Sequence, residues 1–160
     1  MRASDRENPD LFWALRGGGG NFGVVTSFEY RLHPVGPEVL AGLIVHPFSN
    51  AKELFEGYRR VSAAAPDELA IWVVLRKAPP LPFLPADVHG KEIFVIAVCY
   101  VGSIEEGRKA IAPVQALGTP IADVIGPVPF AGWQTALDPL LTPGARNTGS
   151  RTASPASTTV

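Results

Sequence analysis

Residues 8–32 read Asn-Pro-Asp-Leu-Phe-Trp-Ala-Leu-Arg-Gly-Gly-Gly-Gly-Asn-Phe-Gly-Val-Val-Thr-Ser-Phe-Glu-Tyr-Arg-Leu, and this stretch bears most directly on the fold. An asparagine cap followed by proline predicts a helix from Asn8 to about Arg16. The four glycines Gly17–Gly20 end that helix, because glycine takes backbone conformations that other residues avoid. Apolar and polar side chains then alternate from Phe22 to His33, which predicts a strand.

The segment Gly18–Gly23 matches the spacing G-x-G-x-x-G. A dinucleotide fold needs a strand before this motif and a helix after it, whereas the order here is helix first and strand second. The sequence also lacks the Lys-Ser or Lys-Thr pair of an ATPase phosphate loop. Two interpretations remain open on residue chemistry alone. The run is a glycine-rich connection, or it is a backbone surface that a large cofactor can approach closely.

The remaining elements follow the linker Pro34–Pro37, where we expect a domain boundary. Hydrophobic periodicity predicts strands at residues 39–46, 69–75, 92–101 and 121–125, and helices from 49 or 50 to about 65 and from 103 to about 117. The strand at 92–101 is apolar on both faces, which predicts a central position in the sheet. Ser103 and Glu106 have the spacing of a capping box. This order indicates an α+β fold.

Residues 8–32 as a whole resemble the end of the flavin domain in berberine bridge enzyme-like, FAD-linked oxidoreductases of the vanillyl-alcohol-oxidase (PCMH-type) family. Residues 126–134 and 137–139 resemble that family's substrate domain more loosely. The resemblance implies the end of a PCMH-type FAD-binding domain, followed by a partial antiparallel-sheet substrate domain with helices on one face. It implies residues 1–36 for the first part and 37–146 for the second.

The resemblance also implies the chemistry. A small organic substrate, such as a sugar, an alcohol or an alkaloid-like molecule, would pass a hydride to flavin N5. The residues carried over to the FAD site, mostly through their backbone groups, are Gly20, Asn21, Gly23, Val24 and Val25. No catalytic residue is assigned. Family members carry an upstream half of the FAD domain and further C-terminal strands that this sequence does not show, so we expect an inactive fragment.

The last residues, 147–160, are polar and without periodicity, which predicts a disordered tail. Relatives in the family tend to read Arg-Asn-Tyr-Trp-Lys-Ser where this chain reads Arg146-Asn-Thr-Gly-Ser-Arg151. Deleting one base from a codon run for Tyr-Trp-Lys-Ser yields Thr-Gly-Ser followed by arginine. A frameshift after Asn147 is therefore our hypothesis, and a natural variable tail is the alternative.

Composition excludes several classes of function. The 160 residues carry a net charge of −1, which argues against nucleic acid as a partner, and no apolar run is long enough to span a membrane. The chain shows no signal peptide, so a cytoplasmic location is expected. Three scattered histidines and the single cysteine, Cys99, predict no metal site, and Cys99 is expected to be a buried thiol. Tyr100 either packs in the core or lines the substrate pocket.

A non-enzymatic role is the alternative function. An α+β module with unpaired sheet edges would self-associate or complement a separate chain. Size-exclusion chromatography with light scattering would distinguish a defined oligomer from aggregate. In the intact enzyme, the expected partner is a small-molecule substrate.

Overall fold

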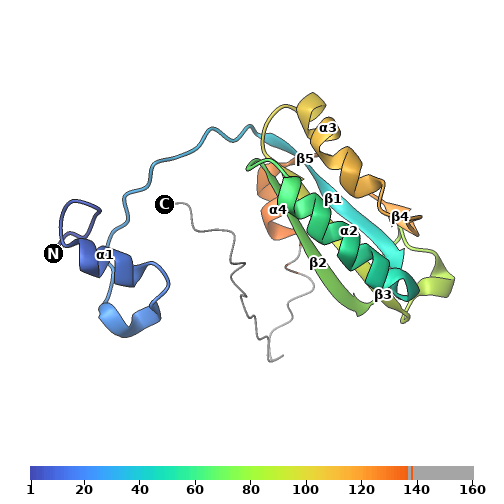
Figure 1. The fold of residues 1–160 in the computed structure, drawn as a ribbon, viewed down its shortest axis with the longest axis horizontal. Coiled ribbons are helices and arrows are strands. Elements are labelled where there is room, and N and C mark those ends of the chain that lie inside the picture. Colours follow the sequence, from blue (N-terminus) through green and yellow to red (C-terminus); the bar gives the residue numbers. More distant parts are fainter. Residues whose placement is uncertain (137, 139–160) are drawn as a thin grey trace. The chain divides into compact units, whose positions relative to one another are not determined.

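The computed structural model describes residues 1–136 and 138. Within it the chain divides into two compact units, the first from Met1 to Pro34 and the second beginning at Val35 (Figure 1). The division falls inside the proline- and glycine-containing linker.

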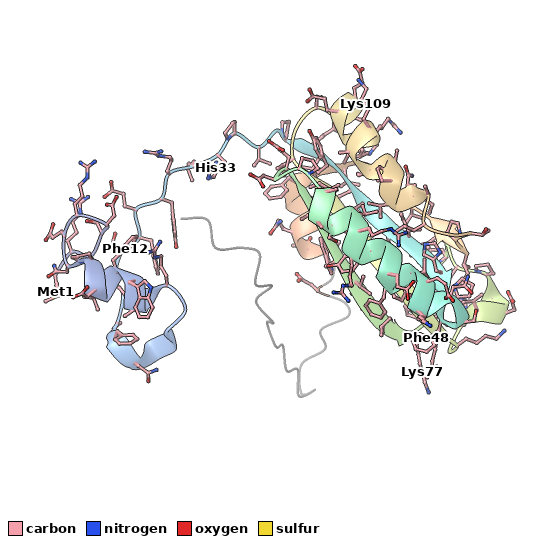
Figure 2. All side chains as sticks on the ribbon, in the orientation of Figure 1. Met1, Phe12, His33, Phe48, Lys77 and Lys109 are labelled. Carbon is pink, nitrogen blue, oxygen red and sulfur yellow. The ribbon has the colours of Figure 1, made fainter. Side chains whose placement is uncertain are left out.

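The first unit is small and has no core of its own. It contains the helix α1 (Pro9–Leu15) and the 3-10 helix η1 (Gly19–Phe22). Every residue from Met1 to Pro34 is exposed or half-buried. Phe12, labelled in Figure 2, lies under the guanidinium of Arg16, which is 4.6 Å from the centre of its ring.

The strand predicted from Phe22 to His33 is not formed. Between Val24 and His33, no backbone group is hydrogen-bonded to another backbone group of the described residues. Val24 is 92% exposed and Leu32 is 86% exposed. The alternating pattern is present, but a strand also requires a neighbouring strand to take up its N–H and C=O groups, and none lies beside this segment in the structure described.

The second unit is an antiparallel sheet in the order β2-β3-β1-β4, with β5 also paired to β1. Its strands are β1 (Glu38–Pro47), β2 (Leu69–Lys77), β3 (Glu92–Tyr100), β4 (Ala122–Asp123) and β5 (Gly126–Pro129). The helices are α2 (Ala51–Ala64), α3 (Ile104–Gln115) and α4 (Phe130–Thr135), with the short 3-10 turns η2 (Phe48–Asn50) and η3 (Ala86–Val88) (Figure 1). The expected α+β class and the central place of β3 are confirmed.

The helices α2 and α3 pack on one face of the sheet and form the main core with it. The buried members of this core are Leu40, Ile44, Leu54, Leu69, Phe94, Ile96, Val98, Tyr100, Ile111 and Val114. The sheet residues among them alternate along each strand, because successive side chains point to opposite faces. Tyr100 is one of them, so it packs under the helices and does not line the opposite face.

Of the closing strand predicted at residues 121–125, only β4 (Ala122–Asp123) is formed, and β5 (Gly126–Pro129) follows it as a separate strand. One register runs through both, since Asp123 faces Ile44 and Gly126 faces Ala41. The interruption lies opposite Gly42, whose φ is +158°. A Cβ on Gly42 would lie 2.4 Å from the carbonyl oxygen of Val124, so the chain passes too close here for any side chain.

The predicted capping box at the start of α3 is formed in part. The Ser103 hydroxyl oxygen accepts a hydrogen bond from the Glu106 backbone N–H at 3.3 Å, as expected. The Glu106 carboxylate, however, accepts from the Ser103 hydroxyl at 2.9 Å and not from the backbone N–H. Pro113 lies in the last turn of the helix without ending it.

His46 is fully buried on the helix side of β1, and neither ring nitrogen has a hydrogen-bond partner among the described residues. Burial lowers its pKa below the ordinary 6.5. The Thr119 backbone and the Asp123 carboxylate, neither of them hydrogen-bonded to the ring, raise the pKa by less. At neutral pH the folded protein therefore holds His46 in its neutral form.

This lowered pKa makes the protein less stable in acid. Below pH 6.5 the unfolded chain binds a proton at His46 more readily than the folded chain, so the free energy of unfolding falls as the pH drops towards the lowered pKa. The His46→Leu variant should lose this part of the pH dependence. At neutral pH it should be as stable as the parent or more so, since two unpaired polar atoms are removed. Urea unfolding between pH 5 and 8 measures the effect.

The exposed His33 provides the matched control for this experiment. His33→Leu should keep the acid-dependent slope of the parent. If the free energy of unfolding of His46→Leu fell with pH as steeply as that of the parent, another group would be responsible for the loss of stability in acid.

Candidate functional site

The sheet face opposite α2 and α3 carries the candidate site, and we call it the groove face. It presents the alternate side chains of the three long strands: Leu43 and Val45 of β1, Trp72, Val74 and Arg76 of β2, and Val95, Ala97 and Cys99 of β3. At one end, the proline-rich segment 78–91 packs on the sheet through Ala78, Leu81, Phe83 and Leu84. At the other end α4 packs on it, with the Trp133 ring centre 6.0 Å from that of Trp72.

A narrow groove lies between the proline-rich segment and the strands. Its volume is about 50 Å³. The lining consists of apolar side chains with one exception, Arg76: Leu43, Val45, Trp72, Val74, Pro79, Leu81, Phe83, Leu84, Ile93, Val95 and Ala97. No acid, histidine, tyrosine, serine or lysine is among them. The groove can therefore hold an apolar group, but it offers no acid–base pair of its own.

Arg76 is half-buried and has no carboxylate within 4.0 Å among the described residues. Its Nε donates a hydrogen bond to the backbone carbonyl of Lys77 at 3.2 Å. The remaining guanidinium N–H groups make no hydrogen bond within the described part of the chain. Arg76 is the one charged residue in the lining of the groove.

Cys99 and Tyr100 end β3 on opposite faces. Cys99 is 8% exposed on the groove face, and burial raises the pKa of its thiol, as expected for a structural cysteine. Tyr100 is 7% exposed on the helix face, where its pKa is raised by burial first and by Glu106 and Glu68 after that.

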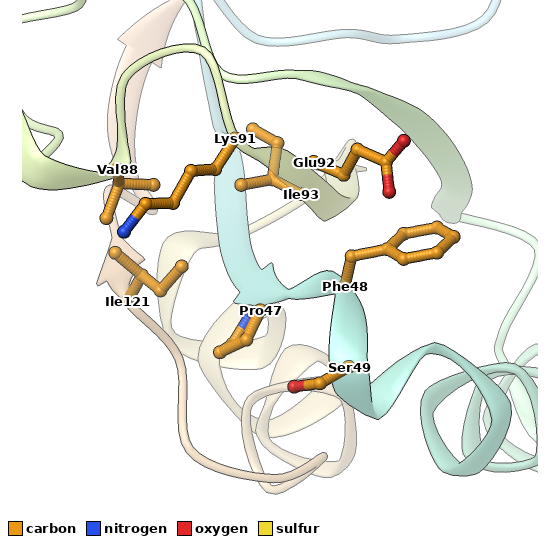
Figure 3. A pocket seen from close by; sticks show the side chains of 8 residues that line it. All are labelled: Pro47, Phe48, Ser49, Val88, Lys91, Glu92, Ile93 and Ile121. Atoms are coloured by element: carbon orange, nitrogen blue, oxygen red, sulfur yellow. The ribbon is translucent and has the colours of Figure 1, made fainter.

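A second hollow lies at the end of the sheet where β1 passes into η2 (Figure 3). It is lined by Pro47, Phe48, Ser49, Val88, Lys91, Glu92, Ile93 and Ile121. Figure 3 shows the amino group of Lys91 extending towards Val88 and Ile121, while the Glu92 carboxylate points the opposite way. Phe48 and Lys77 are labelled at this same end of the sheet in Figure 2. Because its charged groups diverge, this hollow brings no reactive groups together.

The five residues expected to contact FAD lie together in the first unit. Gly20 and Asn21 belong to η1, and Gly23, Val24 and Val25 follow it. All five are exposed. The Asn21 side chain donates a hydrogen bond to the Gly18 carbonyl at 2.9 Å, which fixes the turn. Nothing lies within 4 Å of the Cβ position of Gly20 or Gly23.

Neither Trp72 nor Arg76 is predicted as a site residue from the sequence. Their separation of four residues on one predicted strand places both on the same face, so strand periodicity was the available signal. What periodicity does not show is which face the helices cover.

Among the residues that the structure describes, no group of three or more His, Cys, Asp or Glu side chains could hold a metal ion. None of the helices in that same part of the chain has the length and hydropathy needed to cross a membrane.

Known proteins resemble this chain in sequence. An FAD-linked oxidoreductase of Dictyostelium discoideum is 30% identical over 139 residues, which cover 86% of this chain and 27% of that protein. The (R)-6-hydroxynicotine oxidase of Paenarthrobacter nicotinovorans is 32% identical over 122 residues, covering 76% of this chain and 25% of that enzyme. The chain is a relative of the FAD-linked oxidoreductases. It spans about a quarter of the length of these curated relatives.

A solved structure supports the same assignment to the FAD-linked oxidoreductases. The crystal structure of 6-hydroxy-D-nicotine oxidase from Arthrobacter nicotinovorans matches with a TM-score of 0.61 and 26% identity, covering 89% of this chain and 30% of that one. No protein-family model matches the chain. FAD is therefore the cofactor of the proteins to which this chain is related.

Proposed function

We propose that this chain is part of a berberine bridge enzyme-like, PCMH-type flavoprotein that oxidises a small organic substrate. The first unit contributes backbone contacts to FAD, and the groove face of the second unit contributes to the substrate site. Bound FAD would serve as the hydride acceptor in this oxidation. The observation that carries the proposal is the glycine segment, Gly18–Val25, which is exposed from Gly19 onward, in a chain related to FAD-linked oxidoreductases.

The glycine segment fits a large planar cofactor. Gly20 and Gly23 leave open space where a side chain would stand, so a ligand can approach the backbone. From Val24 to His33, the backbone groups are not used by any other part of the described backbone. A cofactor with polar ring edges can take up such free N–H and C=O groups. Gly23 has φ +122°, which a residue with a side chain rarely adopts.

The groove face could form one side of a substrate-binding site, because it is apolar and because α2 and α3 pack on the opposite face of the sheet. It lacks a group that could take a proton from a substrate. Arg76 stays charged, and the thiol of Cys99 has a raised pKa. We therefore propose that the 160-residue chain on its own binds without turnover.

FAD titration of the chain tests the proposal, with flavin fluorescence anisotropy as the measurement. We expect weak but saturable binding. Gly20→Val should weaken this binding roughly ten-fold, since nothing lies within 4 Å of the Cβ position and the added side chain would displace a ligand. Incubating chain, FAD and (R)-6-hydroxynicotine without oxygen should leave the flavin oxidised.

Gly36→Val is the matched control, because Gly36 is also exposed and lies outside the glycine segment. It should bind FAD like the parent. Equal effects of the two substitutions, or no binding at all, would contradict a flavin-contacting role for Gly20. Flavin reduction by the chain alone would contradict the proposed lack of turnover.

Self-association is the second candidate function, and the free edge of β2 favours it. Among the described strands, β2 lies at the outside of the sheet and pairs only with β3. Leu75 on this strand is 47% exposed. Unpaired, partly apolar edges invite pairing with another chain. Light scattering after size-exclusion chromatography should show a defined dimer if this edge is an interface, and a monomer if it is not.

A further inference from the structure

We propose that the groove face recognises a small aromatic acid, with the ring edge in the groove and the acidic group at Arg76. This inference rests on the proposed function, since it names the class of substrate for the same site. It is drawn from the lining of the groove and from the one cation that borders it.

The lining of the groove does not favour a carbohydrate. Sugar hydroxyls need hydrogen-bond partners, and binding them against unpaired apolar surface leaves their polar groups desolvated without compensation. The side chains that line the groove, Arg76 apart, are aliphatic, proline or aromatic, and none carries a carboxylate, amide or hydroxyl. An apolar substrate loses nothing at such a surface. Trp72 and Phe83 add aromatic rings to the lining, against which another ring packs favourably.

The cation selects the polar end of the substrate. Arg76 is half-buried, borders the groove and has no carboxylate partner within 4.0 Å in the described part of the chain. A guanidinium presents a planar fork of N–H groups that matches a carboxylate and remains charged at every physiological pH. A ligand carboxylate or phenolate at the mouth would supply the missing partner. A neutral or cationic head group would not.

The size of the groove limits the apolar end. At about 50 Å³ it is smaller than a site that encloses a whole ligand. It can admit the edge of a ring or a short alkyl group while the rest of the ligand stays at the open mouth. A flat molecule with its acidic group on the opposite edge satisfies both the groove and Arg76.

Calorimetric titration of the full 160-residue chain tests this, with 2-naphthoate, neutral 2-naphthamide and maltotriose as probes. We expect saturable binding of 2-naphthoate, binding of 2-naphthamide roughly ten-fold weaker, and no binding of maltotriose. Arg76→Met keeps the aliphatic stem and removes the charge. This substitution should lower the affinity for 2-naphthoate to that for 2-naphthamide and leave the affinity for 2-naphthamide unchanged.

Arg59→Met is the matched control, because Arg59 is exposed on α2, which packs on the other face of the sheet. It should leave all three affinities unchanged. Should Arg76→Met unfold, Arg76→Lys keeps a positive charge and should retain a preference for 2-naphthoate over 2-naphthamide. The proposal would be overturned if the parent bound the two naphthalene probes equally, if it bound maltotriose more tightly than 2-naphthoate, or if it did not bind 2-naphthoate. The FAD titration does not involve these probes. A negative result with the naphthalene probes would therefore contradict the proposed substrate class but not the proposed contact with FAD.

Discussion

The Phe94→Ala variant is expected to lose about 3–5 kcal/mol of unfolding free energy, the range for removing a fully buried phenylalanine side chain. Phe94 is 0% exposed near the start of β3 and belongs to the core that α2 and α3 form with the sheet. Its ring stands edge-on to that of Phe55 at 4.9 Å between centres. Truncation removes this contact and leaves a cavity between sheet and helix. Urea unfolding followed by circular dichroism measures the loss.

Phe28→Ala is the matched control, since Phe28 is 66% exposed in the first unit. It should change the unfolding free energy by no more than about 0.5 kcal/mol, as surface substitutions usually do. If Phe94→Ala were as mild as Phe28→Ala, the helices would not be packed on this face of the sheet.

The free energy of unfolding of the Gly42→Val variant is expected to be lower than that of the parent by about 3 kcal/mol or more, because the site cannot accept a side chain. The Cβ would lie 2.4 Å from the Val124 carbonyl oxygen and 2.6 Å from the Ile125 Cα. Both are backbone atoms and cannot rotate away. The segment between β4 and β5 would have to leave β1, with loss of the hydrogen bond from the Val124 N–H to the Leu43 carbonyl. Thermal unfolding and amide exchange of Ala122–Gly126 report this separation.

Gly126→Val provides the comparison within the same part of the sheet. Gly126 is the first residue of β5, and nothing lies within 4 Å of its Cβ position. The free energy of unfolding of this variant should stay within about 1 kcal/mol of that of the parent, the ordinary range for a substitution that creates no clash. Equal losses at both glycines would contradict the close approach at Gly42.

The sheet and its two main helices were predictable because their periodicity is strong. The apolar run of β3 indicated a strand buried on both sides, and the structure places it at the centre of the sheet. The strand predicted at Phe22–His33 has an equally clear pattern but is not formed. Periodicity reports which side chains a strand would bury, whereas strand formation also depends on a partner for the backbone. The interrupted closing strand depends on the contact at Gly42, which no local pattern reveals.

The candidate site was predictable only in part. The glycine segment stood out because of its composition, and its contact with FAD stays a prediction. The tail from residue 147, including the proposed frameshift after Asn147, lies outside the described residues. The groove face depends on which side of the sheet α2 and α3 cover and on the folding back of the proline-rich segment. Both are long-range features, so Arg76 gained a role only once the faces were known.

The central claim is that the glycine segment contacts the flavin of an FAD-linked oxidoreductase. A residue-resolved NMR titration of the isotope-labelled chain with FAD tests it most directly. We expect concentration-dependent shifts of the backbone amides from Gly18 to Val25, with the amides of α2 and α3 unchanged. Shifts confined to the second unit, or no shifts at the highest FAD concentration reached, would contradict the claim.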